Sequence, residues 1–163
     1  MTKNFENLRR AAFRVALYVF FGSCIGVVVA GCEKAKEIDD RLVIETAAGP
    51  QIFKIEVART AEEKSRGLMF RTSLEPGHGM LFPYDEPLEA SMWMRNTYIS
   101  LDMIFISSEG RIERIAERTE PLSDDIVSSG SMVTAVLEIG GGEAARLEIR
   151  PGDIVRHPHF AVP

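Results

Sequence analysis

The sequence predicts a mainly β fold, a compact antiparallel sandwich or half-closed barrel with one or two short helices. The chain has 163 residues, which is enough for about one domain and too short for a (β/α)8 barrel. Runs of residues that alternate between apolar and polar outnumber runs with helical periodicity. Strands and helices do not alternate along the chain as they do in folds built on a parallel sheet.

The first two strands are expected to form a hairpin. Residues 41–46 alternate well enough to form a strand, and a Gly-Pro pair then interrupts the pattern. Residues 51–58 alternate regularly, with Phe53 and Ile55 on one face and Lys54 on the other. Alternation with period two, bounded by turn residues, is typical of paired strands with one buried face.

A short helix is expected after this hairpin. Thr60 and Glu63 have the spacing of a capping box, in which each side chain accepts a hydrogen bond from the backbone amide of the other residue. The acidic side chains of Glu62 and Glu63 also suit the positive end of a helix. We expect the helix to end near Gly67, because glycine is common just beyond a helix C-terminus.

The remaining strands are short apolar or alternating runs between turn residues. We expect them at 79–82, 90–94, 101–106, 110–118, 131–138 and 154–157. Apart from the strand at 79–82, the chain from Met69 to Pro87 is expected to be irregular, because prolines and glycines recur in it. Ser107–Gly110 predicts a hairpin turn, and residues 142–147 predict a second short helix.

The first 32 residues carry the features of an export signal. Four basic residues stand among the first fourteen, and an uncharged apolar run extends from Val15 to Cys32. A basic segment followed by an apolar one is typical of secretory signals, because the basic end stays in the cytoplasm. The run ends in Val29-Ala30-Gly31-Cys32, which resembles a bacterial lipobox with Cys32 as the acylated residue.

We therefore expect a lipoprotein-type signal peptide at 1–31, a flexible linker at 32–40 and a β domain at 41–159. The expected location is the periplasmic side of the bacterial cell envelope, with the membrane as partner through the lipid on Cys32. Two alternatives stay open: the apolar run is an uncleaved anchor, or an ordinary signal peptidase cleaves after Ala30. All three place the domain outside the cytoplasm.

The charge of the exported part argues against nucleic-acid binding. The whole chain has a net charge of −5, and leaving out the four basic residues and Glu6 of the signal gives −8 for residues 32–163. Nucleic-acid binding requires a clustered basic face. If Cys32 is acylated, no thiol remains in the domain, because Cys24 lies inside the signal, so neither a disulfide nor a zinc-thiolate site is expected.

Several short motifs in the β domain resemble those of a known family. They are Arg66-Gly67-Leu68-Met69 with Arg71, Gly79-Met80-Leu81-Phe82, Trp93-Met94-Arg95-Asn96-Thr97, Leu101-Asp102-Met103-Ile104-Phe105, Val136-Leu137-Glu138 and Gly152-Asp153-Ile154-Val155. In this order and spacing they resemble the domain-of-unknown-function family 192 (DUF192, also UPF0127). The resemblance implies an all-β domain, often exported or membrane-attached, and carries no established activity. Arg95 stands where lysine is usual, and Ser100 where proline often stands.

Polar residues near the ends of the predicted strands form the candidate ligand site. They are Arg71, Arg95, Asn96, Thr97, Asp102 and Glu138. Guanidinium groups together with an amide and a hydroxyl can bind a carboxylate, a phosphate or a sugar hydroxyl, so the first hypothesis is a non-catalytic envelope module that binds a small polar ligand or a partner. The structural alternative is that Arg95 pairs with Asp102 or Glu138 and fixes a chain reversal.

Two further functions stay open at this point. One is a hydrolase-like enzyme that uses Asp102, Glu138 or His78 as acid and base. The other is a copper-handling protein that uses the thioethers of Met92 and Met94, since soft sulfur ligands suit Cu(I). No catalytic motif is present, so the catalytic residues stay unassigned, and no cofactor and no metal site is expected. The neighbouring Trp93 is interpreted as a core aromatic, with a stacking platform as the alternative.

Overall fold

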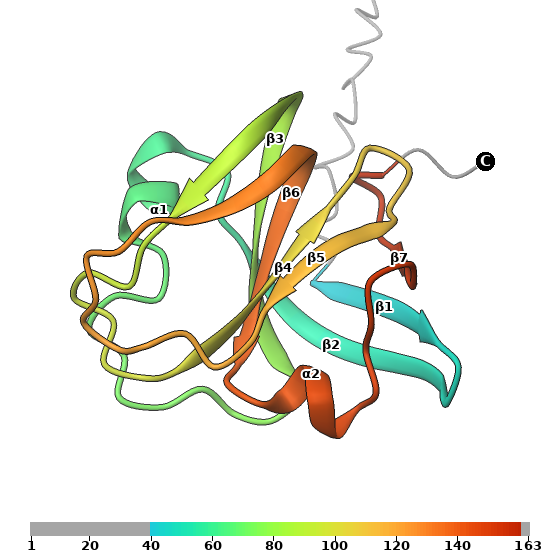
Figure 1. The fold of residues 1–163 in the computed structure, drawn as a ribbon, viewed down its shortest axis with the longest axis horizontal. Coiled ribbons are helices and arrows are strands. Elements are labelled where there is room, and N and C mark those ends of the chain that lie inside the picture. The colour runs from blue at the N-terminus through green and yellow to red at the C-terminus, as the bar shows by residue number, and fades with distance from the viewer. Residues whose placement is uncertain (1–39, 161–163) are drawn as a thin grey trace, which may run out of the picture. The chain divides into compact units, whose positions relative to one another are not determined.

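The computed structural model describes residues 40–160, which form a seven-stranded sheet with two short helices (Figure 1). The strands are Arg41–Thr46 (β1), Gly49–Val57 (β2), His78–Met92 (β3), Leu101–Ile106 (β4), Ile112–Ala116 (β5), Val127–Gly140 (β6) and Ile154–Arg156 (β7). The helices are Ala61–Arg66 (α1) and Glu143–Arg146 (α2). The expected mainly β fold with two short helices is confirmed. The predicted signal peptide, Cys32 and the linker up to residue 39 lie outside the described residues.

The sheet curls so that its two edge strands approach each other. The strand order is β5-β4-β6-β3-β2-β1-β7, and a bridge between Arg111 and Ile154 links the two edges. The amide of Val155 donates to the carbonyl of Gly110 at 2.7 Å. A Cβ atom on Gly110 would lie 2.5 Å from the carbonyl oxygen of Val155. This contact between the two edges, the seam, therefore requires glycine at position 110. The result is a half-closed barrel.

One strand pair departs from the expected antiparallel arrangement. β1 and β2 form the predicted hairpin, but β2 and β3 run parallel, with Ile55 opposite Gly79 and Val57 opposite Leu81. A parallel pair needs a crossover connection, and α1 lies in it. The capping box is confirmed: the Thr60 hydroxyl accepts from the Glu63 amide at 3.1 Å, and the Glu63 carboxylate accepts from the Thr60 amide at 2.9 Å.

β3 is one long strand where two short strands and an irregular segment were expected. Pro83 pairs with Ala135 of β6, while Leu88 pairs with Val133, so the intervening residues of β3 bulge out of the ladder. Proline is tolerated at such bulges because no ladder hydrogen bond is needed there. The expectation of irregular chain from Met69 to Pro87 is therefore confirmed for residues 69–77 and wrong for residues 83–87, which belong to β3. β6 is longer than expected and β5 is shorter.

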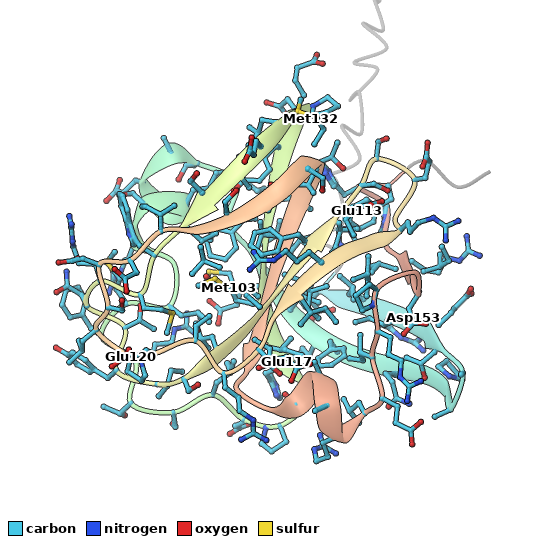
Figure 2. All side chains as sticks on the ribbon, in the orientation of Figure 1. Met103, Glu113, Glu117, Glu120, Met132 and Asp153 are labelled. Carbon is cyan, nitrogen blue, oxygen red and sulfur yellow. The ribbon has the colours of Figure 1, made fainter. Side chains whose placement is uncertain are left out.

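Residues 79–82 of β3, all of β4 and residues 133–139 of β6 are buried, so both faces of this central part of the sheet contribute to a core. One core contains Phe53, Leu81, Ile104 and Leu137, and the other contains Met80, Phe82, Met103, Phe105 and Val136. Figure 2 shows Met103 inside the molecule and Met132 projecting from one end of the β3–β6 pair. Side chains of consecutive β6 residues thus point into different cores. The position of Glu138 along β6 therefore decides which side of the sheet its carboxyl faces. Between residues 40 and 160, neither helix has the length and apolar character needed to cross a bilayer.

Candidate functional site

A buried carboxyl group without a protein partner marks the candidate site. Glu138 of β6 lies opposite Met80 of β3 and Met103 of β4, and it is only 4% exposed. Within residues 40–160, no group donates a hydrogen bond to its carboxyl or forms an ion pair with it. Burial raises the pKa of Glu138 to about 8. A buried carboxyl that nothing compensates destabilises a fold, and such groups cluster at functional sites.

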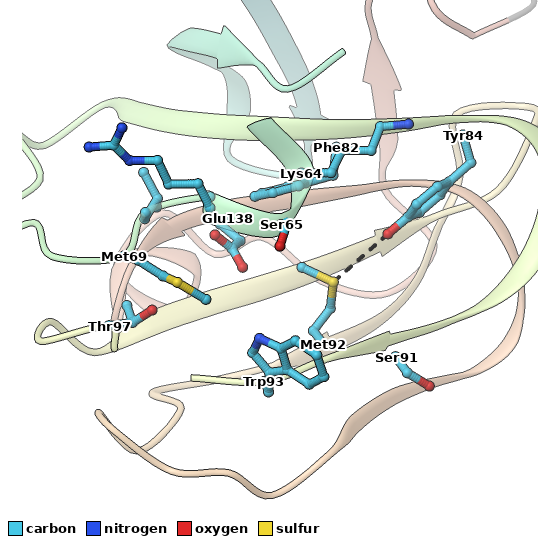
Figure 3. Close-up of a pocket in the computed structure, with 13 residues that line it drawn as sticks. Lys64, Ser65, Met69, Phe82, Tyr84, Ser91, Met92, Trp93, Thr97 and Glu138 are labelled. Atoms are coloured by element: carbon cyan, nitrogen blue, oxygen red, sulfur yellow. Dashed lines mark hydrogen bonds between the residues drawn. The ribbon is translucent and has the colours of Figure 1, made fainter. Parts of the chain in front are cut away.

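The Glu138 carboxyl faces a pocket of about 320 Å³. Thioethers and rings form much of its wall, from Met69, Phe82, Met92 and Trp93. Figure 3 shows the Glu138 carboxyl and the side chains of Met69, Met92 and Trp93 arranged around one space. This volume and this mixture of apolar walls with a few polar groups are typical of sites for small molecules.

Polar groups from α1, β3 and the following loop complete the pocket. Lys64, Ser65 and Arg66 come from α1, the phenol of Tyr84 from the β3 bulge, and the hydroxyl of Thr97 from the loop before β4. The Lys64 ammonium lies 5.2 Å from the centre of the Tyr84 ring. Burial raises the pKa of Tyr84, and the nearby Glu138 raises it further.

Weak hydrogen bonds fix the two sulfur atoms of the pocket. The Tyr84 hydroxyl donates to Met92 Sδ at 3.8 Å, drawn as the dashed line in Figure 3. The Asn96 amide donates to Met69 Sδ at 3.9 Å. Methionine side chains are otherwise flexible, so these contacts hold the thioethers in place along the wall.

Two strained loop residues, Phe70 and Leu122, are hydrogen-bonded to the loop that contains Asn96 and the pocket-lining Thr97. Phe70 and Leu122 have φ values of 66° and 63°, a region that bulky residues rarely adopt, whereas Asn96 at 57° is of a type that adopts it readily. The Phe70 amide donates to the Asn96 carbonyl at 2.8 Å, and the Leu122 amide donates to the Thr97 carbonyl at 3.1 Å. Strain of this kind persists only where the surrounding structure enforces it, so these loops are preformed.

The predicted ligand residues are only partly brought together. Thr97 and Glu138 line the same pocket, and Asn96 orients one of its sulfurs. Arg71 lies elsewhere, in a bidentate ion pair with Glu56 at 2.6 and 2.7 Å. This pair lines a different pocket, and the Arg71 guanidinium lowers the pKa of Glu56.

Arg95 does not pair with Asp102 or Glu138, the two acids that were considered as its structural partners. Its Nε donates to Asp124 at 2.6 Å in an exposed ion pair. Its guanidinium also lies 5.1 Å from the centre of the Trp93 ring. Trp93 is 43% exposed, so its interpretation as a core residue is wrong, and its indole forms part of the pocket wall.

Asp102 has a fully buried carboxylate that binds backbone amides. It accepts hydrogen bonds from Arg118 at 2.7 Å, from Gly142 at 2.9 Å and from Ala144 at 2.9 Å. These bonds hold the end of β6 and the start of α2 against β4. Asp102 pairs with Ile139 in the ladder, one position beyond Glu138, so its side chain leaves the opposite face of the sheet.

The residues of the two other hypotheses are also separated. Asp102 and Glu138 lie on opposite faces, and His78 lines the pocket that contains Arg71. Met92 lines the Glu138 pocket, whereas Met94 is buried and accepts a hydrogen bond from the Thr119 hydroxyl at 3.2 Å. Within residues 40–160, no three His, Cys, Asp or Glu side chains are grouped so that they could hold a metal ion.

A family comparison identifies the chain. The model of the family DUF192, described as "Uncharacterized ACR, COG1430", matches residues 43–157. The chain belongs to the DUF192 family. Comparison with curated proteins gives no match.

Two solved structures resemble this DUF192 domain. A protein of unknown function from Novosphingobium aromaticivorans is 42% identical, with a TM-score of 0.70, and the match covers 72% of this chain and 84% of that one. A protein from Sinorhizobium meliloti described as a putative transcription regulator is 39% identical, with a TM-score of 0.71, and the match covers 74% of this chain and 94% of that one.

The pocket of this DUF192 domain draws on the segments that carry the family resemblance. Arg66 and Met69 come from the first of these motifs, Phe82 from the second, Trp93 and Thr97 from the third, and Glu138 from Val136-Leu137-Glu138. Sequence reasoning selected only Thr97 and Glu138 from this set as ligand residues. The signal that points to the site is one acid in the apolar run at 135–139, because a buried polar residue is more informative than a buried apolar one.

Proposed function

We propose that this DUF192 domain is a non-catalytic binding module that holds a small polar ligand in the Glu138 pocket. The observation that carries the proposal is the Glu138 carboxyl, buried at the pocket wall with no partner among the described residues. A ligand that hydrogen-bonds this group compensates for the cost of burying it. The preformed loops near Phe70 and Leu122 favour binding to a site that exists before the ligand arrives.

Binding is favoured over hydrolysis by the separation of the acidic groups. An acid–base pair needs two titratable side chains within reach of one substrate. Asp102, the other buried Asp or Glu considered for this role, is on the opposite face and is saturated by backbone amides. Glu138 is the single carboxyl among the residues that line the pocket, so a pair of carboxyl groups is not available there for acid–base hydrolysis.

We also propose that the domain is exported and tethered to the membrane through a lipid on Cys32. The basis is the sequence alone, a basic segment, an apolar run and a lipobox-like end. Expression of the full chain and of Cys32→Ser with radiolabelled palmitate tests this proposal. We expect label on the natural chain only, and equal labelling of both chains would contradict lipidation at Cys32.

Native mass spectrometry of the full chain in mild detergent tests ligand binding. The natural chain, purified without chelators, is expected to carry additional mass from a small molecule. Glu138→Gln should lose that mass, because the amide cannot replace the carboxylate as an acceptor for a charged donor. Glu113→Gln, an exposed position on β5, is the matched control and should retain it. A bound molecule that persists in Glu138→Gln would contradict this site.

A further inference from the structure

We infer that the ligand of the Glu138 pocket is a zwitterion of about amino-acid size, whose ammonium group binds Glu138 and whose acidic group binds Lys64 or Arg66. This inference rests on the proposed function, because it names the chemistry of the ligand in that same pocket. Three features carry it: the placement of the charges, the chemistry of the walls and the size of the space.

The charges of the pocket have opposite signs at separate places. Lys64 and Arg66 line the pocket, and among the described residues neither is ion-paired to a carboxylate. The Glu138 carboxyl comes from β6, whereas both cations come from α1. The pocket thus has one ionisable carboxyl on β6 and two cationic side chains on α1. A ligand with both a positive and a negative group can bind the carboxyl at one end and a cation of α1 at the other.

The walls next to the carboxylate suit an ammonium group. A carboxylate only accepts hydrogen bonds, and an ammonium group donates three of them. The thioethers of Met69 and Met92 and the rings around them are polarizable surfaces that attract cations. Two rings of the pocket already have cations on their faces, Tyr84 with Lys64 and Trp93 with Arg95. A ligand without an acidic group would make no ionic contact with Lys64 or Arg66.

The dimensions of the pocket limit the rest of the ligand. About 320 Å³ is at the lower end of the range for small-molecule sites. Phe82, Met69 and Met92 supply an apolar surface between the carboxyl and the cations of α1. An amino acid with an apolar side chain places its charged groups and its apolar part in this pattern.

Binding of an ammonium group requires Glu138 to be ionised. The titratable or charged side chains that line the pocket with Glu138 are Tyr84 from β3 and Lys64 and Arg66 from α1. Burial raises the pKa of Glu138 to about 8, so the carboxyl carries a proton at neutral pH in the absence of a ligand. Glu138 therefore releases a proton when the ligand binds. The affinity should rise about tenfold per pH unit between pH 6 and 8, and should level off above that.

Isothermal titration of the full chain in detergent tests this inference with defined probes. L-leucine, L-methionine, L-phenylalanine and L-tryptophan are titrated first at pH 8. The tightest is then compared with its analogue lacking the carboxylate and its analogue lacking the amine. For L-phenylalanine these are phenethylamine and 3-phenylpropionate. We expect the amino acid to bind at least tenfold more tightly than either analogue.

Substitutions test which residues bind the ammonium group and which bind the acidic group of the ligand. Glu138→Gln should reduce the affinity for the amino acid to that for the analogue without the amine. The double variant Lys64→Gln/Arg66→Gln should reduce it to that for the analogue without the carboxylate. Arg150→Gln, at an exposed arginine outside the pocket, is the control and should bind as the natural chain does.

Two outcomes overturn the inference. One is that none of the four amino acids binds at millimolar concentration, and the other is that an analogue binds as tightly as its parent. The proposed function is judged separately by native mass spectrometry. A copurified molecule that lacks an amine, yet is lost in Glu138→Gln, would support the proposed binding function and contradict the inference that the ligand is a zwitterion.

Discussion

Asp102 and Glu138 belong to adjacent pairs of the β4–β6 ladder, and their carboxyl groups leave the sheet on opposite faces. Asp102 pairs with Ile139, and Met103 pairs with Glu138. One carboxylate accepts three backbone hydrogen bonds, whereas the other faces a pocket without a protein partner. Two acids that are close in the ladder thus have different physical roles, one in holding the chain and one in recognition.

Asp102→Asn should strongly destabilise the domain. An amide offers one acceptor atom and places an NH₂ group where the carboxylate accepted hydrogen bonds from amides, so at least one buried amide loses its partner. We expect a loss of about 2–4 kcal/mol in the free energy of unfolding, measured by urea denaturation. Asp124→Asn, at an exposed ion pair, is the control, with an expected loss under about 1 kcal/mol. Equal losses for the two variants would contradict the role of Asp102.

Glu138 should make the stability of the domain fall as the pH rises. The folded state raises the pKa of Glu138 from 4.5 to about 8, so the folded state binds a proton that the unfolded state has released. Between these two values this group should lower the free energy of unfolding by about 1.4 kcal/mol per pH unit, with no further change above pH 8.

Comparison with Glu138→Gln isolates this effect. The variant has no proton to release, so its stability between pH 5 and 8 should lack this decline. Its free energy of unfolding at pH 8 should exceed that of the natural chain. Denaturant titrations in ligand-free buffers at several pH values measure both. Parallel pH profiles for the two chains would show that Glu138 is not titrating with a raised pKa.

Arg95→Ala should have a small effect on stability. Its ion pair with Asp124 is exposed on both sides, and exposed pairs contribute about 0.2–1 kcal/mol. Contact with the Trp93 ring adds a cation–π term of about 0.5–1 kcal/mol at an exposed site. Thermal unfolding of the variant should therefore show a total loss below about 2 kcal/mol. A loss of 3–5 kcal/mol, the size expected for a broken buried ion pair, would mean that Arg95 has a structural partner.

Gly79→Ala should disturb the strand pairing beside the site. A Cβ atom at Gly79 would lie 2.6 Å from the carbonyl oxygen of Glu138, so β3 and β6 would have to move apart where Glu138 is held. We expect a loss of about 1–3 kcal/mol, measured by denaturant unfolding. Gly140→Ala is the matched control on β6, because its Cβ would meet only ordinary contacts at 3.5 Å. A Gly79→Ala chain as stable as the control would contradict this close approach.

Local sequence patterns predicted the strands and the helix cap that depend on residues close together in the chain. The alternation around Phe53 and the capping box of Thr60 and Glu63 both appear in the structure. The patterns failed at β3, where prolines suggested irregular chain. The bulge after Pro83 removes the need for ladder hydrogen bonds, and that depends on the partner strand β6. The parallel pairing of β2 with β3 is likewise a tertiary property.

The candidate site was only partly predictable for a similar reason. Glu138 and Thr97 were selected by residue type, but strand register decides which residues share a face, and a shift of one position reverses it. No sequence pattern showed that Asp102 and Glu138 are one position out of register. Lys64 was not singled out, and Arg66 appeared only within a motif of the family resemblance, because their place in the pocket depends on how the crossover packs.

The seam between Gly110 and Val155 also affects when the domain can fold. β7 pairs with β1 near Ile44 and bonds to the turn before β5, so it joins an early strand to the middle of the chain. The ring of strands is completed only after Arg156 has been synthesised. Contacts between distant parts of a chain slow folding. A nascent chain with this topology therefore completes its sheet only after translation has passed β7.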